Sequence, residues 1–131
     1  MLSVPGIGKA LNRANLALAI MTPQTYEIAV EPGGLVNLPS SQWLFRTNRT
    51  IESLLDGLNL HNLRLKATAR GIGQAAEKKQ VIHLWAHPHE FRTEKDFEKL
   101  GYVFGYVAEE VGKGRLESLT MAALATHAVE Q

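Results

Sequence analysis

The residues best suited to chemistry lie in one short stretch, Val81-Ile82-His83-Leu84-Trp85-Ala86-His87-Pro88-His89. It holds three of the five histidines of the chain and one of its two tryptophans. An imidazole titrates near neutral pH, which suits a general acid, a general base or a metal ligand. An indole offers a large flat surface with one polar N–H. Since no other stretch concentrates such groups, this one is the first candidate for a functional site.

The length, branching and boundaries of residues 81–86 predict a β-strand, whose alternate residues share a face. One face is uniformly apolar, with Ile82, Leu84 and Ala86. The other carries Val81, His83, Trp85 and His87. A buried parallel strand is normally apolar on both faces, so this second face indicates a lined cavity. Pro88 removes a ladder donor, so His87 and His89 are expected where the strand becomes a loop. That carboxyl end is where α/β sheets and barrels build active sites.

Several functions are compatible with these histidines. On a strand, His83 and His87 would lie roughly 13 Å apart, too far to share one metal. His87 and His89 could converge in a bent loop on a substrate, or on a metal together with Glu90. His87 could instead act alone as a general acid or base. They could also be ordinary hydrogen-bonded groups of a core or its rim.

Composition narrows the class of protein. With 131 residues, the chain forms one domain or part of one. A net charge of +1 without a basic run gives no reason to expect nucleic acid or an anionic membrane as partner. The absence of cysteine excludes disulfides, thiolate ligands and a cysteine nucleophile. No apolar run approaches the roughly 20 residues that span a bilayer, so no membrane span is expected.

The first half of the chain predicts a helix followed by a hairpin. Residues 9–21 loosely resemble a signal peptide but lack an uninterrupted apolar region and a cleavage site. We therefore expect a helix there, peripheral within residues 1–24, and a cytoplasmic protein. Strand-forming segments at 26–30 and 35–38 flank a Pro-Gly-Gly turn, which indicates two short strands. Residues 42–45 extend briefly, and 46–59 are expected to be irregular with one helical turn.

The second half predicts three helices around the histidine strand. The first covers 60–79, and its glycines, Gly71 and Gly73, indicate a kink or close packing. We expect its inward residues to be Leu60, Leu63, Ala67, Ile72 and Ala75. The second begins with the capping signature Thr93-Glu94-Lys95-Asp96 and ends at Gly112. Its apolar stripe is Phe97, Leu100, Phe104, Val107 and Val111.

Residues 116–119 are expected to form a short strand or an extended link. Thr120 then caps a terminal helix with Met121, Leu124 and Ala128 inward. The alternation of helices and strands along the chain is typical of an α/β layer or barrel with parallel strands.

The segment from His83 to Phe91, followed by a capped helix and Leu119-Thr120-Met121, resembles a known family. It is similar to the C-terminal part of polysaccharide deacetylases, in a branch whose last barrel strand carries Trp-x-His-Pro-His. The 64–80 helix and residues 34–41 fit this branch more loosely. The resemblance spans about residues 25–125. It implies that residues 1–131 are a single partial domain, the C-terminal half of a distorted (β/α) barrel.

The resemblance also implies an activity. The family removes acetyl groups from N-acetylated sugars with a divalent, zinc-like metal. By this resemblance, His87 protonates the leaving amine and His89 is an added pocket residue, so both are candidate catalytic residues. Trp85, which would shape the acetate pocket, and His83 are candidate substrate-binding residues. The expected partner is an acetylated sugar or polysaccharide.

The chain departs from the family in its metal site. It has no Asp-Asp pair and no Arg-x-Pro-Tyr segment. The pattern His83-x-x-x-His87-Pro88 imitates a family metal motif, but its context fits the final strand. No metal is therefore supported by this chain alone, and we expect little or no turnover from it. Whether it is an enzyme stays open.

Exposed strand edges predict that a partner chain or a homodimer completes the barrel. The rival hypothesis is a non-catalytic, deacetylase-derived module that binds sugar or pairs with a subunit. Trp85 would then be a stacking platform.

Overall fold

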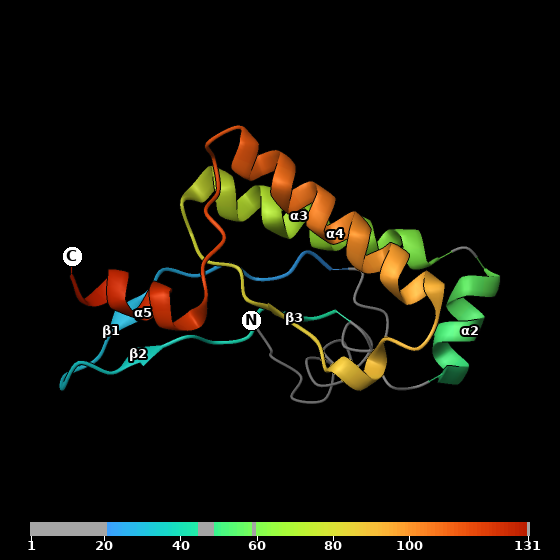
Figure 1. Ribbon diagram of the computed structural model, residues 1–131, viewed down its shortest axis with the longest axis horizontal. Helices are drawn as coiled ribbons and strands as arrows, with labels where there is room; N and C mark the ends of the chain where they lie inside the picture. The colour runs from blue at the N-terminus through green and yellow to red at the C-terminus, as the bar shows by residue number, and fades with distance from the viewer. Residues whose placement is uncertain (1–20, 45–48, 59, 131) are drawn as a thin grey trace, which may run out of the picture.

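A computed structural model describes residues 21–44, 49–58 and 60–130. These residues form a mixed α/β structure (Figure 1). The strands are β1 (Ala29–Val30), β2 (Val36–Asn37), β3 (Gln42–Trp43) and β4 (Leu84–Trp85). The helices are α2 (Arg49–Gly57), α3 (His61–Lys78), the 3-10 helix η1 (Pro88–Glu90), α4 (Glu94–Gly112) and α5 (Met121–Val129). The helix predicted at 9–21 lies, except for Met21, outside the described residues.

The predicted hairpin is confirmed. β1 and β2 pair antiparallel, with Ala29 opposite Asn37 and Val30 opposite Val36. Gly33 and Gly34 adopt φ values of 101° and 82°, which side chains other than glycine rarely tolerate and which this tight turn requires. The ladder is shorter than the two predicted segments. Helix α5 packs beside it (Figure 1).

The parallel strand pair is also confirmed. Gln42 lies opposite Leu84 and Trp43 opposite Trp85, with α2 and α3 as the connection between β3 and β4. The pairing covers only part of the predicted 81–86 strand. Upstream of it, Val81 bonds to Tyr26 in an antiparallel bridge, so this segment changes partner as it proceeds.

Helices α3 and α4 pack side by side and enclose the core (Figure 1). The buried apolar residues of the described chain are Ala67, Ala69, Ile72, Ala75, Ala76 and Val103. Gly71 fits into this packing because a Cβ there would lie 2.9 Å from both Ile82 Cδ1 and Pro23 Cδ. Of the two predicted reasons for glycine in this helix, close packing is therefore confirmed.

The predicted inward face of α4 is largely wrong. Phe97 and Phe104 are 59% and 62% exposed, and Val111 is exposed as well. The buried residues are instead Val103 and Glu110. Val103 and Glu110 are seven residues apart, as are Phe97, Phe104 and Val111, so each set lies along its own side of α4. Periodicity fits both sides equally well, and the packing of the helix covers the side of Val103 and leaves the phenylalanines outside.

The predictions for residues 46–59, Leu63 and Met121 need correction. Residues 46–59 were expected to be irregular with one helical turn, but α2 occupies Arg49–Gly57. Leu63 and Met121, expected inward, are exposed. Residues 116–119 form the extended link, without a strand. In the described ranges the strands form two separate two-stranded sheets and no closed barrel. Within the same ranges, no helix has the length and apolar character needed to cross a bilayer.

Candidate functional site

Four aromatic rings gather at the carboxyl end of the parallel pair, and we call them the Trp–His cluster: Trp43, Trp85, His87 and His89. Trp43 and Trp85 stack with ring centroids 4.9 Å apart and planes inclined by 9°. His87 meets Trp85 edge-on at 5.1 Å and Trp43 at 5.9 Å. His89 stacks on His87 at 5.1 Å. The structure thus brings together three of the four predicted site residues.

The strand register explains the cluster. Because Trp43 and Trp85 are opposite one another in the ladder, their side chains project from the same side of neighbouring strands. Past β4, His87 stays extended at φ −90° and ψ 140°, and Pro88 starts η1. This short helix turns the chain, so the imidazole of His89 returns to that of His87. Both imidazoles are exposed, whereas the indoles are half-buried.

A buried carboxylate supports the Trp–His cluster. Glu90 is 9% exposed, and its Oε2 accepts a hydrogen bond from Trp43 Nε1 at 2.9 Å. The same oxygen accepts a second bond from the backbone N–H of His87 at 2.7 Å. Its other oxygen, Oε1, is buried without a hydrogen-bond partner among the described residues. Glu90 thereby connects β3 to the turn that follows β4.

The same geometry bears on the metal hypothesis. Glu90 Oε2 is already engaged by two N–H donors, so Glu90 is a poor third ligand for His87 and His89. Across the ranges described, no group of three His, Cys, Asp or Glu side chains is arranged to hold a metal ion.

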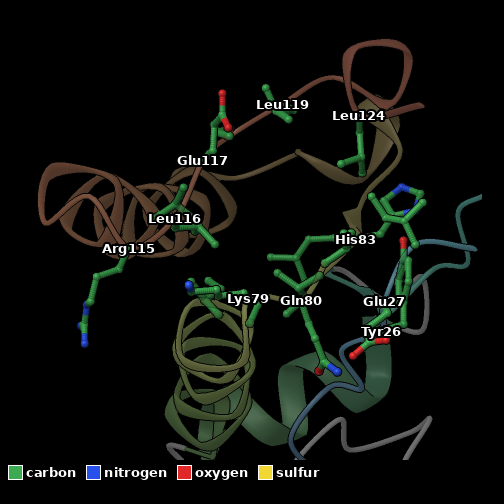
Figure 2. Close-up of a pocket in the computed structure, with 18 of the residues that line it drawn as sticks. Tyr26, Glu27, Lys79, Gln80, His83, Arg115, Leu116, Glu117, Leu119 and Leu124 are labelled. Atoms are coloured by element: carbon green, nitrogen blue, oxygen red, sulfur yellow. The ribbon is translucent and has the colours of Figure 1, made fainter. Parts of the chain in front are cut away.

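His83 lies apart from the Trp–His cluster. It lines a cavity of about 890 Å³, together with Tyr26, Gln80 and Leu124 (Figure 2). Its backbone N–H donates to Ser41 Oγ at 3.0 Å. Trp85, His87 and His89 are not part of this lining. Strand alternation predicted that His83, Trp85 and His87 line one cavity. In the structure, His83 lines the cavity and the other two belong to the Trp–His cluster.

Two polar atoms at the cavity lack partners in the described part of the chain, His83 Nδ1 and the Tyr26 hydroxyl. Burial raises the pKa of the Tyr26 hydroxyl above its usual value. Most of the remaining lining is apolar, and the Arg115 side chain points away from the cavity (Figure 2). Arg115 is engaged by Glu110, with Nη2 and Oε2 2.6 Å apart. The cavity therefore combines two buried, unpartnered polar atoms with a mostly apolar lining that also holds polar and charged side chains such as Gln80 and Glu27.

Sequence reasoning missed two residues of the site. Trp43 was expected only in a brief extended segment, and Glu90 was considered only as a metal ligand. Pairing 42–45 in parallel with 81–86 would have placed the two tryptophans together. The position of Glu90, three residues after His87 and two after Pro88, is the signal of a reciprocal cap on a short helix.

The fold and site define a mixed α/β protein with an aromatic–histidine site at the carboxyl end of a parallel strand pair. In comparisons with known proteins, no family model, no curated protein and no solved structure matches this chain.

Proposed function

We propose that this chain is the carbohydrate-binding, C-terminal half of a deacetylase-like barrel. In this proposal the Trp–His cluster binds an N-acetylated sugar, and the chain does not hydrolyse it alone. The observation that carries the proposal is the stacked Trp43–Trp85 pair with His87 against its edge. The sequence resemblance to polysaccharide deacetylases supplies the class of ligand.

The Trp–His cluster offers the contacts that a pyranose ring uses. Half-buried indoles present an apolar surface for the C–H face of a sugar. The exposed imidazoles of His87 and His89 can donate to or accept from hydroxyl and amide groups. With a suitably placed amide, His87 is the residue that would pass a proton to a leaving amine.

Hydrolysis needs an activated water in addition to an acid, and the aspartates of this chain have other roles. Asp56 and Asp96 are its only aspartates. Asp56 Oδ1 lies 3.4 Å from Lys99 Nζ, and Asp96 accepts hydrogen bonds at the start of α4. Neither carboxylate is available to activate water beside His87. We therefore propose binding without turnover for the isolated chain.

Tryptophan fluorescence tests this proposal directly, because both tryptophans of the chain lie in the Trp–His cluster. Titration with N-acetylglucosamine oligosaccharides is expected to change the emission saturably. His87→Ala should weaken the affinity about tenfold, the effect of about 1.4 kcal/mol for a lost hydrogen bond. His127→Ala, on α5 and outside the Trp–His cluster, is the control and should leave the affinity unchanged.

An unchanged emission and unchanged indole N–H resonances at millimolar sugar would contradict the proposal. Equal weakening by His87→Ala and His127→Ala would also contradict it, since binding would then not occur at the Trp–His cluster.

A second proposed function is subunit pairing, in which a second copy of this chain covers what the missing barrel half would cover. Large apolar residues of α4, Phe97, Phe104 and Val111, are exposed. Within the described ranges the parallel pair β3–β4 has no third strand, and an unpaired edge invites pairing with another chain. The described core is mostly alanine, which leaves little apolar burial without a partner.

Sedimentation velocity tests the pairing. The chain is expected to dimerise with rising concentration, and Phe104→Ser should shift it toward monomer. Tyr102→Ser, an exposed residue outside the Phe97–Phe104–Val111 strip of the same helix, is the matched control. A chain that stays monomeric at all concentrations, or equal effects of both substitutions, would argue against pairing through α4.

A further inference from the structure

We infer that Glu90 is the positioning residue of the Trp–His cluster, and that its carboxylate sets how the indole pair and His87 are presented to a ligand. The positioning role of Glu90 can be tested in the protein without a ligand. Only its consequence for sugar affinity rests on the function proposed above.

The first support is the bridging position of the carboxylate. Oε2 accepts from the Trp43 indole and from the His87 backbone, at 2.9 and 2.7 Å. Trp43 belongs to β3 and His87 follows β4, so one oxygen links both strands of the parallel pair at their carboxyl ends. Hydrogen bonds to an ionised acceptor are about twice as strong as neutral ones. Burial of Glu90 shields them from competing water.

The second support is what these bonds constrain. The indole N–H is the sole polar group of a tryptophan side chain. When it is bonded to Glu90, the Trp43 ring cannot turn about its own axis without losing that bond. The ring therefore keeps its flat face on Trp85 and its edge-to-face contact with His87, whose plane is inclined to it by 88°. The backbone bond fixes His87 at the same time.

The local sequence explains how a glutamate reaches this position. Pro88 begins η1 with a fixed φ angle, and Glu90 is the third residue of this helix. From there a side chain one methylene longer than aspartate folds back to the His87 N–H.

The third support is energetic. Glu90 Oε1 is buried without a partner in the described part of the chain, and a buried unsatisfied polar atom costs stability. An apolar residue would avoid that cost but would leave Trp43 Nε1 and the His87 N–H without their acceptor. The contribution of Glu90 is therefore carried by these two bonds, which hold the indole of Trp43 and the backbone of His87.

The test compares Glu90→Ala and Glu90→Gln, with Glu117→Ala at an exposed position as control. The readouts are near-UV circular dichroism of the indole pair and the two indole N–H resonances. We expect Glu90→Ala to abolish the ordered indole signal while far-UV helicity is retained. Glutamine keeps an acceptor oxygen, so Glu90→Gln should restore the signal and move the Trp43 N–H resonance upfield. Glu117→Ala should resemble the unmodified protein.

An unchanged near-UV spectrum in Glu90→Ala would overturn the inference. If Glu90→Ala fails to fold, Glu90→Gln decides, because an unmoved Trp43 N–H resonance in that variant would equally overturn it. Where sugar binds, Glu90→Ala should weaken affinity about tenfold and Glu90→Gln by less than about twofold. A protein that shows the spectral changes but binds no sugar refutes the proposed function and leaves the positioning role intact.

Discussion

The indole ring of Trp43 stacks on that of Trp85 with centroids 4.9 Å apart, although α2 and α3 separate the two residues along the chain. The contact therefore exists only when the β3–α2–α3–β4 unit is folded. It reports on long-range structure through two chromophores.

Indole coupling gives the first prediction. Two stacked indoles couple electronically. The indole circular dichroism signal of the protein should therefore be larger than the sum of the signals that the two tryptophans give separately. We expect Trp43→Phe and Trp85→Phe each to remove this excess, with the remaining indole contributing a weak band. Far-UV spectra and urea unfolding serve as controls for folding. If the spectra of the two variants add up to the spectrum of the unmodified protein, the rings are not stacked in solution.

Replacement of Gly71 gives the second prediction. A Cβ at this position would meet the terminal carbon of Ile82, which can move, and the ring of Pro23, which is rigid. Gly71→Ala should therefore lower the free energy of unfolding by about 1–3 kcal/mol. Gly73→Ala is the matched control on the same helix, where the Cβ would have an ordinary 3.5 Å contact with Tyr106 Oη. It should be neutral or stabilising by up to about 1 kcal/mol, because alanine favours helix. Urea denaturation measures both, and equal effects would refute the close packing.

The third prediction concerns pH and the start of α4. Partial burial acts to raise the pKa of the Asp96 carboxyl, but hydrogen bonds from Arg92 and Thr93 outweigh it and lower that pKa. Oδ2 accepts from Thr93 N and Thr93 Oγ1, both at 2.8 Å. A lowered folded-state pKa stabilises the protein above the unfolded-state pKa. This stability is lost as the pH falls through the folded-state pKa.

Asp96→Asn should therefore destabilise the protein by about 1 kcal/mol at neutral pH, the usual size of a capping interaction. The difference should shrink in acid, where the aspartate of the unmodified protein is protonated. Glu98→Gln removes one negative charge from an exposed position of the same helix and serves as control. Thermal unfolding at neutral and acidic pH provides the measurement. A difference that persists unchanged in acid would mean that the carboxylate charge does not contribute.

The ion pair after α4 gives the fourth prediction. Glu110 is 1% exposed, and Arg115 Nη2 lies 2.6 Å from its Oε2. Arg115→Ala leaves the buried Glu110 carboxylate with only the longer, 3.5 Å contact to Lys113 Nζ. Loss of an ion-pair partner costs about 3–5 kcal/mol at fully buried sites. Because the Arg115 side chain is half exposed, we expect about 1–2 kcal/mol. The double variant Glu110→Gln, Arg115→Ala should recover part of the lost free energy of unfolding, as measured by urea denaturation. Lys113→Ala removes the exposed pair with Glu109 together with the longer, 3.5 Å contact to Glu110. It should change stability by less than about 1 kcal/mol, and by less than Arg115→Ala does.

The elements with strong local signals could be predicted from the sequence. The Pro-Gly-Gly turn between β1 and β2 and the Thr93 and Thr120 caps fixed the hairpin, α4 and α5. The order of elements predicted the parallel strands. α2 was missed because its polar residues resemble those of a loop. The buried face of α4 could not be chosen from periodicity, since two sets of apolar residues share the same spacing and tertiary packing decides which of them is covered.

The candidate site was predicted in part. Strand-end geometry placed His87 and His89 together near Trp85. The contributions of Trp43 and Glu90 depend on the parallel register and on a bond between segments 47 residues apart. Neither follows from local pattern. The separation of His83 arises because strand alternation persists only through Leu84–Trp85.

The alanine-rich core of the described chain has a calorimetric consequence. The increase in heat capacity on unfolding scales with the apolar surface that becomes hydrated, and an alanine side chain contributes little of it. The stability of this chain should therefore vary gently with temperature, with a shallow maximum and a broad thermal transition. Scanning calorimetry should then show a small increase in heat capacity on unfolding for a protein of this length. The increase should be larger for a complex in which a partner covers Phe97 and Phe104.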